Sequence, residues 1–139
     1  MAIVSKANAE WKGSLKEGAG EVSFGTFKGD YTFASRFETG GKTNPEELIA
    51  AAHASCYSMQ LSGLLTAAGT PPKSIRTSAA VTIEAGVGIS GIVLEVEAEV
   101  PGISAETFAE TAEKAKEVCP VSKALASVPS ITLKATLKS

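Results

Sequence analysis

The sequence predicts an α+β domain in which antiparallel sheets pack around long buried helices. Three observations support this fold class. Short alternating segments separated by glycines fill the first third of the chain, a long apolar segment follows, and alternating segments return around a second helical segment. Alternation with a period of two indicates half-buried strands, whereas long apolar segments indicate helices. The 139 residues have the usual size of one domain, which we expect to span 1–139.

The first third of the chain is expected to form an antiparallel meander. Segments 7–11, 21–24 and 31–33 are rich in strand-forming residues, and glycine turns separate them. Short strands joined by such turns pair most simply with their sequence neighbours. Residues 37–42 are polar and glycine-rich, and we expect them to form a loop.

The long apolar segment predicts a helix from Asn44 to about Ala68. Asn44 suits the N-cap, Pro45 suits the first helical position, and the Glu47 carboxylate can reach back to the N-cap N–H. Gly69, followed by two prolines, ends the helix. Because apolar and small residues surround this helix on all sides, it should be buried. A chain this short needs a partner subunit to bury it completely.

The second half of the chain is expected to contain three strands and two helices. The strands are the alternating segments 78–84, 92–100 and 131–137. Ser104 caps a helix that ends at about Val118, and Pro120 opens a short helix that ends at about Ala126. Cys119 then occupies the N-cap position of the short helix, since a residue before proline avoids the helical conformation.

Composition excludes several classes of protein. Hydrophobic residues make up 44% of the chain and charged residues 20%, and the formal net charge is -2. Such a balance gives no reason to expect nucleic acid or an anionic membrane as a partner. The chain has no apolar run long enough to cross a membrane and no long apolar segment at its start. We therefore expect a cytoplasmic protein, whose thiols are kept reduced unless redox chemistry is their role.

Cys56 and Cys119 are the only two cysteines. In a reducing compartment a structural disulfide is less common than two free thiols or a transient catalytic disulfide. A cysteine on a buried helix is usually a small hydrophobic residue, so the residues alone leave both a core role and a nucleophilic role open for Cys56. A metal site is not expected, because two cysteines and one histidine supply at most three ligands and no two of them form a short ligand motif.

Three other positions could contribute to chemistry. Cys119 lies at a helix N-terminus, where N–H groups and the helix dipole lower a thiol pKa, although it could simply cap the chain before proline. His53 lies one turn before Cys56, so the two could touch or merely pack. Glu46 is the carboxylate left free when Glu47 caps the helix, unless it only stabilises the first turn. Glu46 and Cys56 are about 15 Å apart along a straight helix, so a shared site needs a long arginine or a second subunit.

Four short motifs occur in order along the chain. They are RF at 36–37, TNPEELI at 43–49, AAHASC at 51–56 and CPVS at 119–122. Their order and spacing resemble the motifs of the OsmC/Ohr superfamily. The fuller strings NPEELIAAAHASCYSM and CPVSKAL are similar to the osmotically inducible OsmC branch rather than the organic hydroperoxide resistance branch. The resemblance covers essentially the whole chain.

The resemblance implies a thiol-dependent peroxidase that reduces organic hydroperoxides, and hydrogen peroxide less well, in oxidative and osmotic stress defence. Cys56 matches the cysteine that attacks the peroxide. Cys119 matches the cysteine that resolves the sulfenic acid as a disulfide, which an external dithiol then reduces without a further cofactor. Arg36 matches the arginine of the site, and Glu46 its partner carboxylate. The resemblance also implies an OsmC-like fold in an intertwined homodimer, with sites at the subunit interface.

The implied chemistry agrees with the residue types. A guanidinium beside a buried thiol stabilises the thiolate, and a carboxylate that holds the guanidinium sets its direction. Two other functions are also considered. A dimeric binding protein could hold an apolar small ligand against the same apolar helix without catalysis. A protein with a structural disulfide would lose stability, but no activity, on reduction.

Overall fold

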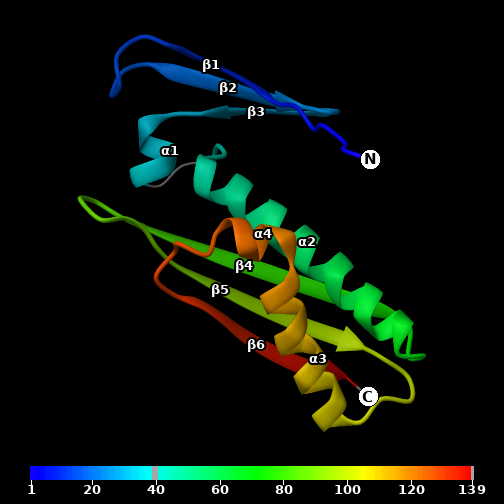
Figure 1. Ribbon diagram of the computed structural model, residues 1–139. Helices are drawn as coiled ribbons and strands as arrows, with labels where there is room; N and C mark the ends of the chain where they lie inside the picture. Colours follow the sequence, from blue (N-terminus) through cyan, green and yellow to red (C-terminus); the bar gives the residue numbers. More distant parts are fainter. Residues whose placement is uncertain (39–40, 139) are drawn as a thin grey trace. The chain divides into compact units, whose positions relative to one another are not determined.

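The computed structural model describes residues 1–38 and 41–138, and it confirms the α+β fold class. The strands form two three-stranded sheets. Helices follow the first sheet in the sequence and also connect two strands of the second sheet (Figure 1). The chain divides into two compact units, Met1–Leu48 and Ile49–Ser139, and each is described here by itself. Among the described residues, no helix has both the length and the apolar character that a membrane span requires.

The first unit contains the predicted antiparallel meander, in the order β1-β2-β3. Its strands are β1 (Asn8–Lys12), β2 (Ala19–Phe24) and β3 (Phe27–Tyr31). The predicted third strand, 31–33, is wrong, because a short helix α1 (Phe33–Phe37) begins there. Thr32 and Ser35 form a capping box: each side-chain hydroxyl accepts a hydrogen bond from the backbone N–H of the other residue. This local capping prevails over the alternating pattern. The predicted loop 37–42 falls partly on residues 39–40, outside the described part of the chain.

An aromatic pair packs across the meander. The rings of Trp11 and Tyr31 have centroids 5.5 Å apart, and Gly20 on the central strand pairs with both residues. A Cβ atom at Gly20 would lie 2.5 Å from the Tyr31 ring and 2.7 Å from the Trp11 ring. Glycine is therefore the residue that allows the two rings to approach each other over the strand.

Helix α2 (Pro45–Ala67) begins and ends close to the predicted positions. The Asn44 side chain accepts the Glu47 N–H at 2.8 Å, which confirms the N-cap. The Glu47 carboxylate accepts from the Thr43 hydroxyl at 3.1 Å, rather than from the N-cap N–H as predicted. At the other end Gly69 has a φ of +86°, and its N–H donates to a carbonyl of the last turn, as expected for a glycine C-cap.

The second unit contains a mixed sheet in the order β4-β5-β6. Its strands are β4 (Ser74–Glu84), β5 (Gly88–Glu99) and β6 (Ile131–Lys138). Strands β4 and β5 are antiparallel and both begin earlier than predicted, whereas β5 and β6 are parallel. The prediction of wholly antiparallel sheets is therefore wrong. The reason is the long connection through α3 (Ala105–Val118) and α4 (Pro120–Ala124), which returns the chain to the same end of the sheet.

The N-cap positions predicted for the helices of this connection are confirmed. The Ser104 side chain accepts the Thr107 N–H at the start of α3, and Cys119 is the N-cap of α4, followed by Pro120. Helix α4 ends at Ala124, earlier than predicted. A kink at the Cys119–Pro120 step thus separates the two helices and gives Cys119 a fixed place between them.

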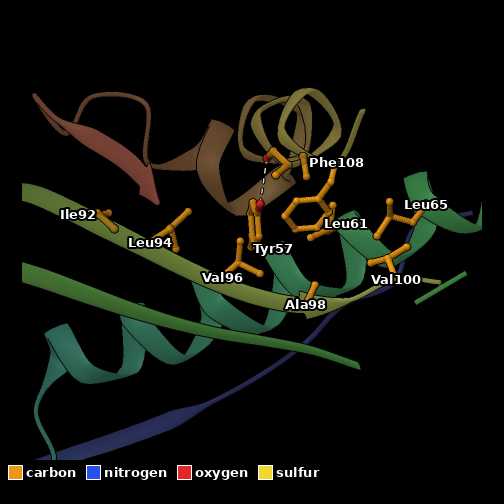
Figure 2. Close-up of a cluster of buried hydrophobic side chains, with 11 residues drawn as sticks. Tyr57, Leu61, Leu65, Ile92, Leu94, Val96, Ala98, Val100 and Phe108 are labelled. Carbon is orange, nitrogen blue, oxygen red and sulfur yellow. Dashed lines mark hydrogen bonds between the residues drawn. The ribbon is translucent and has the colours of Figure 1, made fainter. Parts of the chain in front are cut away.

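The core of the second unit lies between the sheet, α2 and α3 (Figure 2). One face of α2 is buried there, through Tyr57, Leu61 and Leu65. The Tyr57 hydroxyl donates to the Ala112 carbonyl at 2.9 Å and so ties α2 to α3. The opposite face of α2 consists mainly of small residues, and Met59 on it is 77% exposed. Within the second unit the helix is therefore buried on one side only, rather than on all sides.

Candidate active site

Arg36 and Glu46 form a bidentate ion pair within the first unit. Arg36 Nε donates to Glu46 Oε1 and Arg36 Nη2 donates to Glu46 Oε2, both at 3.0 Å. The Glu46 side chain is only 7% exposed, whereas that of Arg36 is 38% exposed. The hydrogen bonds to Glu46 raise the pKa of Arg36. The pair therefore fixes the orientation of a permanently charged guanidinium, which keeps N–H groups that do not bond to Glu46.

Hydrogen bonds between α1 and the start of α2 bring this pair together. The Ser35 hydroxyl donates to the Thr43 carbonyl at 2.8 Å, and the Asn44 side-chain amide donates to the Ser35 carbonyl at 2.9 Å. Arg36 follows Ser35 on α1, and Glu46 lies in the first turn of α2. The residues that cap the two helices therefore also set the geometry of the ion pair.

An apolar pocket of about 180 Å³ lies beside Arg36 in the first unit. Aromatic rings form much of its wall, and they come from Trp11, Tyr31, Phe33 and Phe37. The Arg36 guanidinium lies 5.2 Å from the centroid of the Phe37 ring, a cation–π distance. The pocket thus combines one cation with a surround suited to an alkyl or aromatic group.

The two cysteines meet in the second unit. Cys56 on α2 and Cys119 at the start of α4 are both free thiols, and their sulfur atoms are 2.9 Å apart. Cys119 is fully buried, whereas Cys56 is half-buried. A disulfide would bring the sulfurs closer by only about 1 Å. The chain therefore holds a dithiol in near-bonding position, with Cys56 as the sulfur that solvent can reach.

The surroundings of the two sulfurs shift their pKa values in opposite directions. Burial raises the pKa of Cys56, and the hydrogen bond with Cys119 raises it further, although the Val121 backbone lowers it. Burial also raises the pKa of Cys119, but hydrogen-bonding groups of Cys56, Ser122 and Val121 outweigh it, so the pKa of Cys119 is lowered. The Cys119 side chain closes no capping hydrogen bond of its own on α4. When the pair carries one negative charge, this unit favours that charge on Cys119.

His53 contacts Ser122 rather than a thiol. Its Nε2 lies 2.7 Å from Ser122 Oγ, and both residues are buried. The sequence left contact or mere packing open for His53 and Cys56, and among the described residues no hydrogen bond joins the two. Ser122 was not among the predicted site residues. Its position three residues after an N-cap cysteine, where a helix directs backbone N–H groups at the cap, is the signal that could have identified it.

We predict that His53 makes stability depend on pH. Burial lowers the pKa of His53 below its ordinary value of 6.5, so the unfolded chain binds this proton more readily than the folded one. The free energy of unfolding should therefore fall as pH drops below about 6.5, by at most about 1.4 kcal/mol per pH unit. Urea denaturation between about pH 7 and pH 5 measures this. Because this is the only histidine, the same slope in His53→Gln would contradict the assignment.

The four predicted site residues fall into two pairs, one in each unit. Arg36 pairs with Glu46, and Cys56 pairs with Cys119. The chain has an α+β fold and two free thiols in contact. It also has an oriented arginine on α1, the helix that precedes α2 in the sequence. Fold and site together define a protein of the dithiol class. The chain belongs to the OsmC-like protein family, whose model matches residues 38–134.

Comparison with known proteins gives the same family at several distances. The chain is 48% identical to peroxiredoxin OsmC of Escherichia coli K12 over all of both chains. It is 34% identical to an organic hydroperoxide resistance protein of Xanthomonas axonopodis pv. citri, over 68% of this chain and 67% of that protein. Its fold is similar to that of an OsmC-like protein of Mycoplasma pneumoniae, with a TM-score of 0.78, full coverage of both chains and 17% identity.

Proposed function

We propose that this protein is a thiol peroxidase that reduces organic hydroperoxides, and hydrogen peroxide less well, through Cys56 and Cys119. The observation that carries the proposal is the pair of sulfurs 2.9 Å apart, with the more accessible one on Cys56. The similar proteins named peroxiredoxin OsmC and organic hydroperoxide resistance protein support it. The physiological role would be defence against peroxides.

The chemistry proceeds in three balanced steps. The Cys56 thiolate attacks the terminal peroxide oxygen, the O–O bond breaks, and the leaving alkoxide takes a proton to become an alcohol. Cys119 then attacks the sulfur of the Cys56 sulfenic acid, which forms the disulfide and releases water. An external dithiol reduces the disulfide by thiol exchange and leaves as its own disulfide. No bound cofactor is needed for any step.

A nearby positive charge would favour attack by Cys56, because it stabilises the thiolate. Within residues 49–138 the pKa of Cys56 is shifted by burial, by Cys119 and by the Val121 backbone. No cation is among these causes. We propose that Arg36, held by Glu46, supplies the charge. A guanidinium stabilises the thiolate and can also bind a peroxide oxygen. The aromatic pocket beside Arg36 would then hold the alkyl body of the substrate.

A homodimer would complete such a site. The exposed face of α2 consists mainly of small residues, with Met59 projecting from it. Small residues allow two helices to approach closely, and a face of this kind is stabilised by burial against a second copy. We propose that the subunits share sites at this interface, so that both units of the chain work as one functional domain.

A second candidate function is non-catalytic binding of an apolar small ligand. The aromatic pocket of about 180 Å³ favours it, because such a pocket accepts an apolar group whether or not the thiols react. Finding a copurified apolar ligand in protein that consumes no peroxide would support this function over the peroxidase.

The disulfide itself tests the proposed function. One equivalent of an organic hydroperoxide added to reduced protein should consume both thiols and yield one alcohol per chain. Peptide mapping should then identify a disulfide between Cys56 and Cys119, and a dithiol should restore both thiols. Val87→Ala, which changes an exposed side chain in the turn between β4 and β5 and leaves both thiols in place, serves as a control. Consumption of peroxide with both thiols retained would contradict the proposal.

A further inference from the structure

A buried polar contact lies behind the thiol pair and is not used by the chemistry above. His53 and Ser122 are 69 residues apart in sequence, yet Nε2 and Oγ are 2.7 Å apart. His53 has no solvent exposure and Ser122 only 7%. Ser122 lies on α4, three residues after the N-cap Cys119, and its side chain and backbone both lower the pKa of Cys119. The contact therefore connects α2 to the resolving cysteine.

The unused ring nitrogen indicates the direction of this hydrogen bond. His53 Nδ1 is buried and has no hydrogen-bond partner among the described residues. A neutral imidazole carries one N–H and one lone pair, and burial keeps this imidazole neutral by lowering its pKa. A buried N–H without an acceptor is rarer and more costly than an unpaired lone pair. The proton therefore belongs on Nε2, which donates to Ser122 Oγ.

A hydroxyl that accepts from Nε2 is free to donate its own proton elsewhere. The Ser122 side chain lowers the pKa of Cys119, so the Cys119 sulfur three residues earlier is the acceptor that this proton would serve. If the proton were instead on Nδ1, Nε2 would accept from the Ser122 hydroxyl and the sulfur would lose this donor. The tautomer of His53 thus decides whether Cys119 is supplied with a side-chain donor.

We propose that His53 is a positioning residue that turns the Ser122 hydroxyl towards Cys119, so that Cys119 is the sulfur that leaves when an external dithiol reduces the disulfide. This rests on the proposed Cys56–Cys119 disulfide. A thiolate of the dithiol attacks Cys56 Sγ, the S–S bond breaks, and its electron pair leaves on Cys119 Sγ. The second thiol of the dithiol then displaces Cys56 from the mixed disulfide. Its two protons end on the two cysteines.

Exposure and chemistry favour the same sulfur for attack. Cys56 is half-buried and Cys119 fully buried, so an external thiol reaches Cys56. Exchange is faster when the leaving thiol is the more acidic one. The groups that lower the pKa of Cys119 make it the better leaving group, and the same groups would stabilise its thiolate when it resolves the sulfenic acid.

Two measurements test the proposal without any peroxidase activity. The chain has one histidine, so the ring nitrogens of His53 give a single pair of signals in a ¹⁵N NMR spectrum. We expect the spectrum of the neutral Nε2–H tautomer, and the Nδ1–H tautomer would overturn the proposal. In a Cys56→Ser background, ultraviolet absorbance should titrate the Cys119 thiolate. Ser122→Ala and His53→Phe should move this titration to higher pH.

Reduction kinetics test the consequence for the reaction. Dithiothreitol should reduce the oxidised Ser122→Ala protein about tenfold more slowly than the parent, the value of one lost charge-assisted hydrogen bond. His53→Gln keeps an N–H donor near the Nε2 position and should retain most of the rate. Ser58→Ala is the matched control, since the Ser58 hydroxyl on α2 bonds to Thr77 and to the Ala54 carbonyl. Equal rates in Ser122→Ala and the parent would overturn the proposal.

The two proposals fail differently. If peroxide leaves the thiols unoxidised, the peroxidase proposal fails while the tautomer and the Cys119 titration still decide the role of His53. If the titration and the reduction rate do not respond to Ser122→Ala, the positioning role fails while peroxide turnover is unaffected.

Discussion

Replacement of Cys56 by serine is expected to lower kcat/KM for peroxide turnover by at least about a thousandfold. A serine hydroxyl is not ionised near neutral pH and is a weak nucleophile towards peroxide oxygen, so the first step has no substitute in this chain. Cys119 is 2.9 Å away, but it is fully buried and cannot replace Cys56 as the accessible sulfur. A coupled assay of organic hydroperoxide loss with dithiothreitol as electron donor measures this effect.

Cys119→Ser is the matched variant for this prediction. It should react with one equivalent of peroxide at close to the parent rate and then stall, because no resolving thiol is present. Excess peroxide should over-oxidise Cys56 to the sulfinic acid, which mass spectrometry detects. If instead Cys56→Ser keeps full turnover while Cys119→Ser has none, Cys119 is the attacking cysteine and the assignment of roles is reversed.

Arg36→Lys is expected to lower kcat/KM by about a hundredfold, the effect of losing a fixed charge-assisted hydrogen bond in the reaction. Lysine keeps the positive charge but cannot form the two parallel hydrogen bonds, each 3.0 Å, that fix Arg36 on Glu46. The lysine ammonium group would then take several positions instead of one fixed position. Single-turnover oxidation of Cys56, followed by stopped flow, isolates this effect from the reductive half of the cycle.

Glu46→Gln and Arg76→Lys are the comparison variant and the control for that experiment. Glu46→Gln leaves the guanidinium in place with a neutral partner, so we expect a smaller loss than in Arg36→Lys. Arg76 is the only other arginine and lies on β4, so Arg76→Lys should leave the oxidation rate unchanged. A rate for Arg36→Lys equal to that of the parent would remove Arg36 from the proposed site.

Much of the local structure could be predicted because its causes are local. The caps at Asn44 and Ser104, the glycine at the end of α2 and the proline after Cys119 each act on residues a few positions away. The error at 31–33 has the same origin. Alternation suggested a strand there, and the capping box at Thr32 started a helix instead.

The direction of β6 could not be predicted in the same way. Its alternating pattern is equally compatible with antiparallel and parallel pairing. The choice depends on how α3 and α4 cross the sheet, a property of the whole connection rather than of any short segment. The burial of α2 also required the structure, because a helix with apolar residues on all sides does not reveal which side meets the core.

The sequence by itself determined the starts of α2, α3 and α4, the α+β class and, through its motifs, the four residues of the candidate site. Only the tertiary structure decided which atoms meet. It brought together sulfurs 63 residues apart and paired His53 with Ser122 across 69 residues. The physical reason is that capping and alternation involve neighbours along the chain, whereas these contacts depend on the packing of α2 against α4 within one core. His53, which the sequence left without a role, gained its buried partner Ser122 only from that packing.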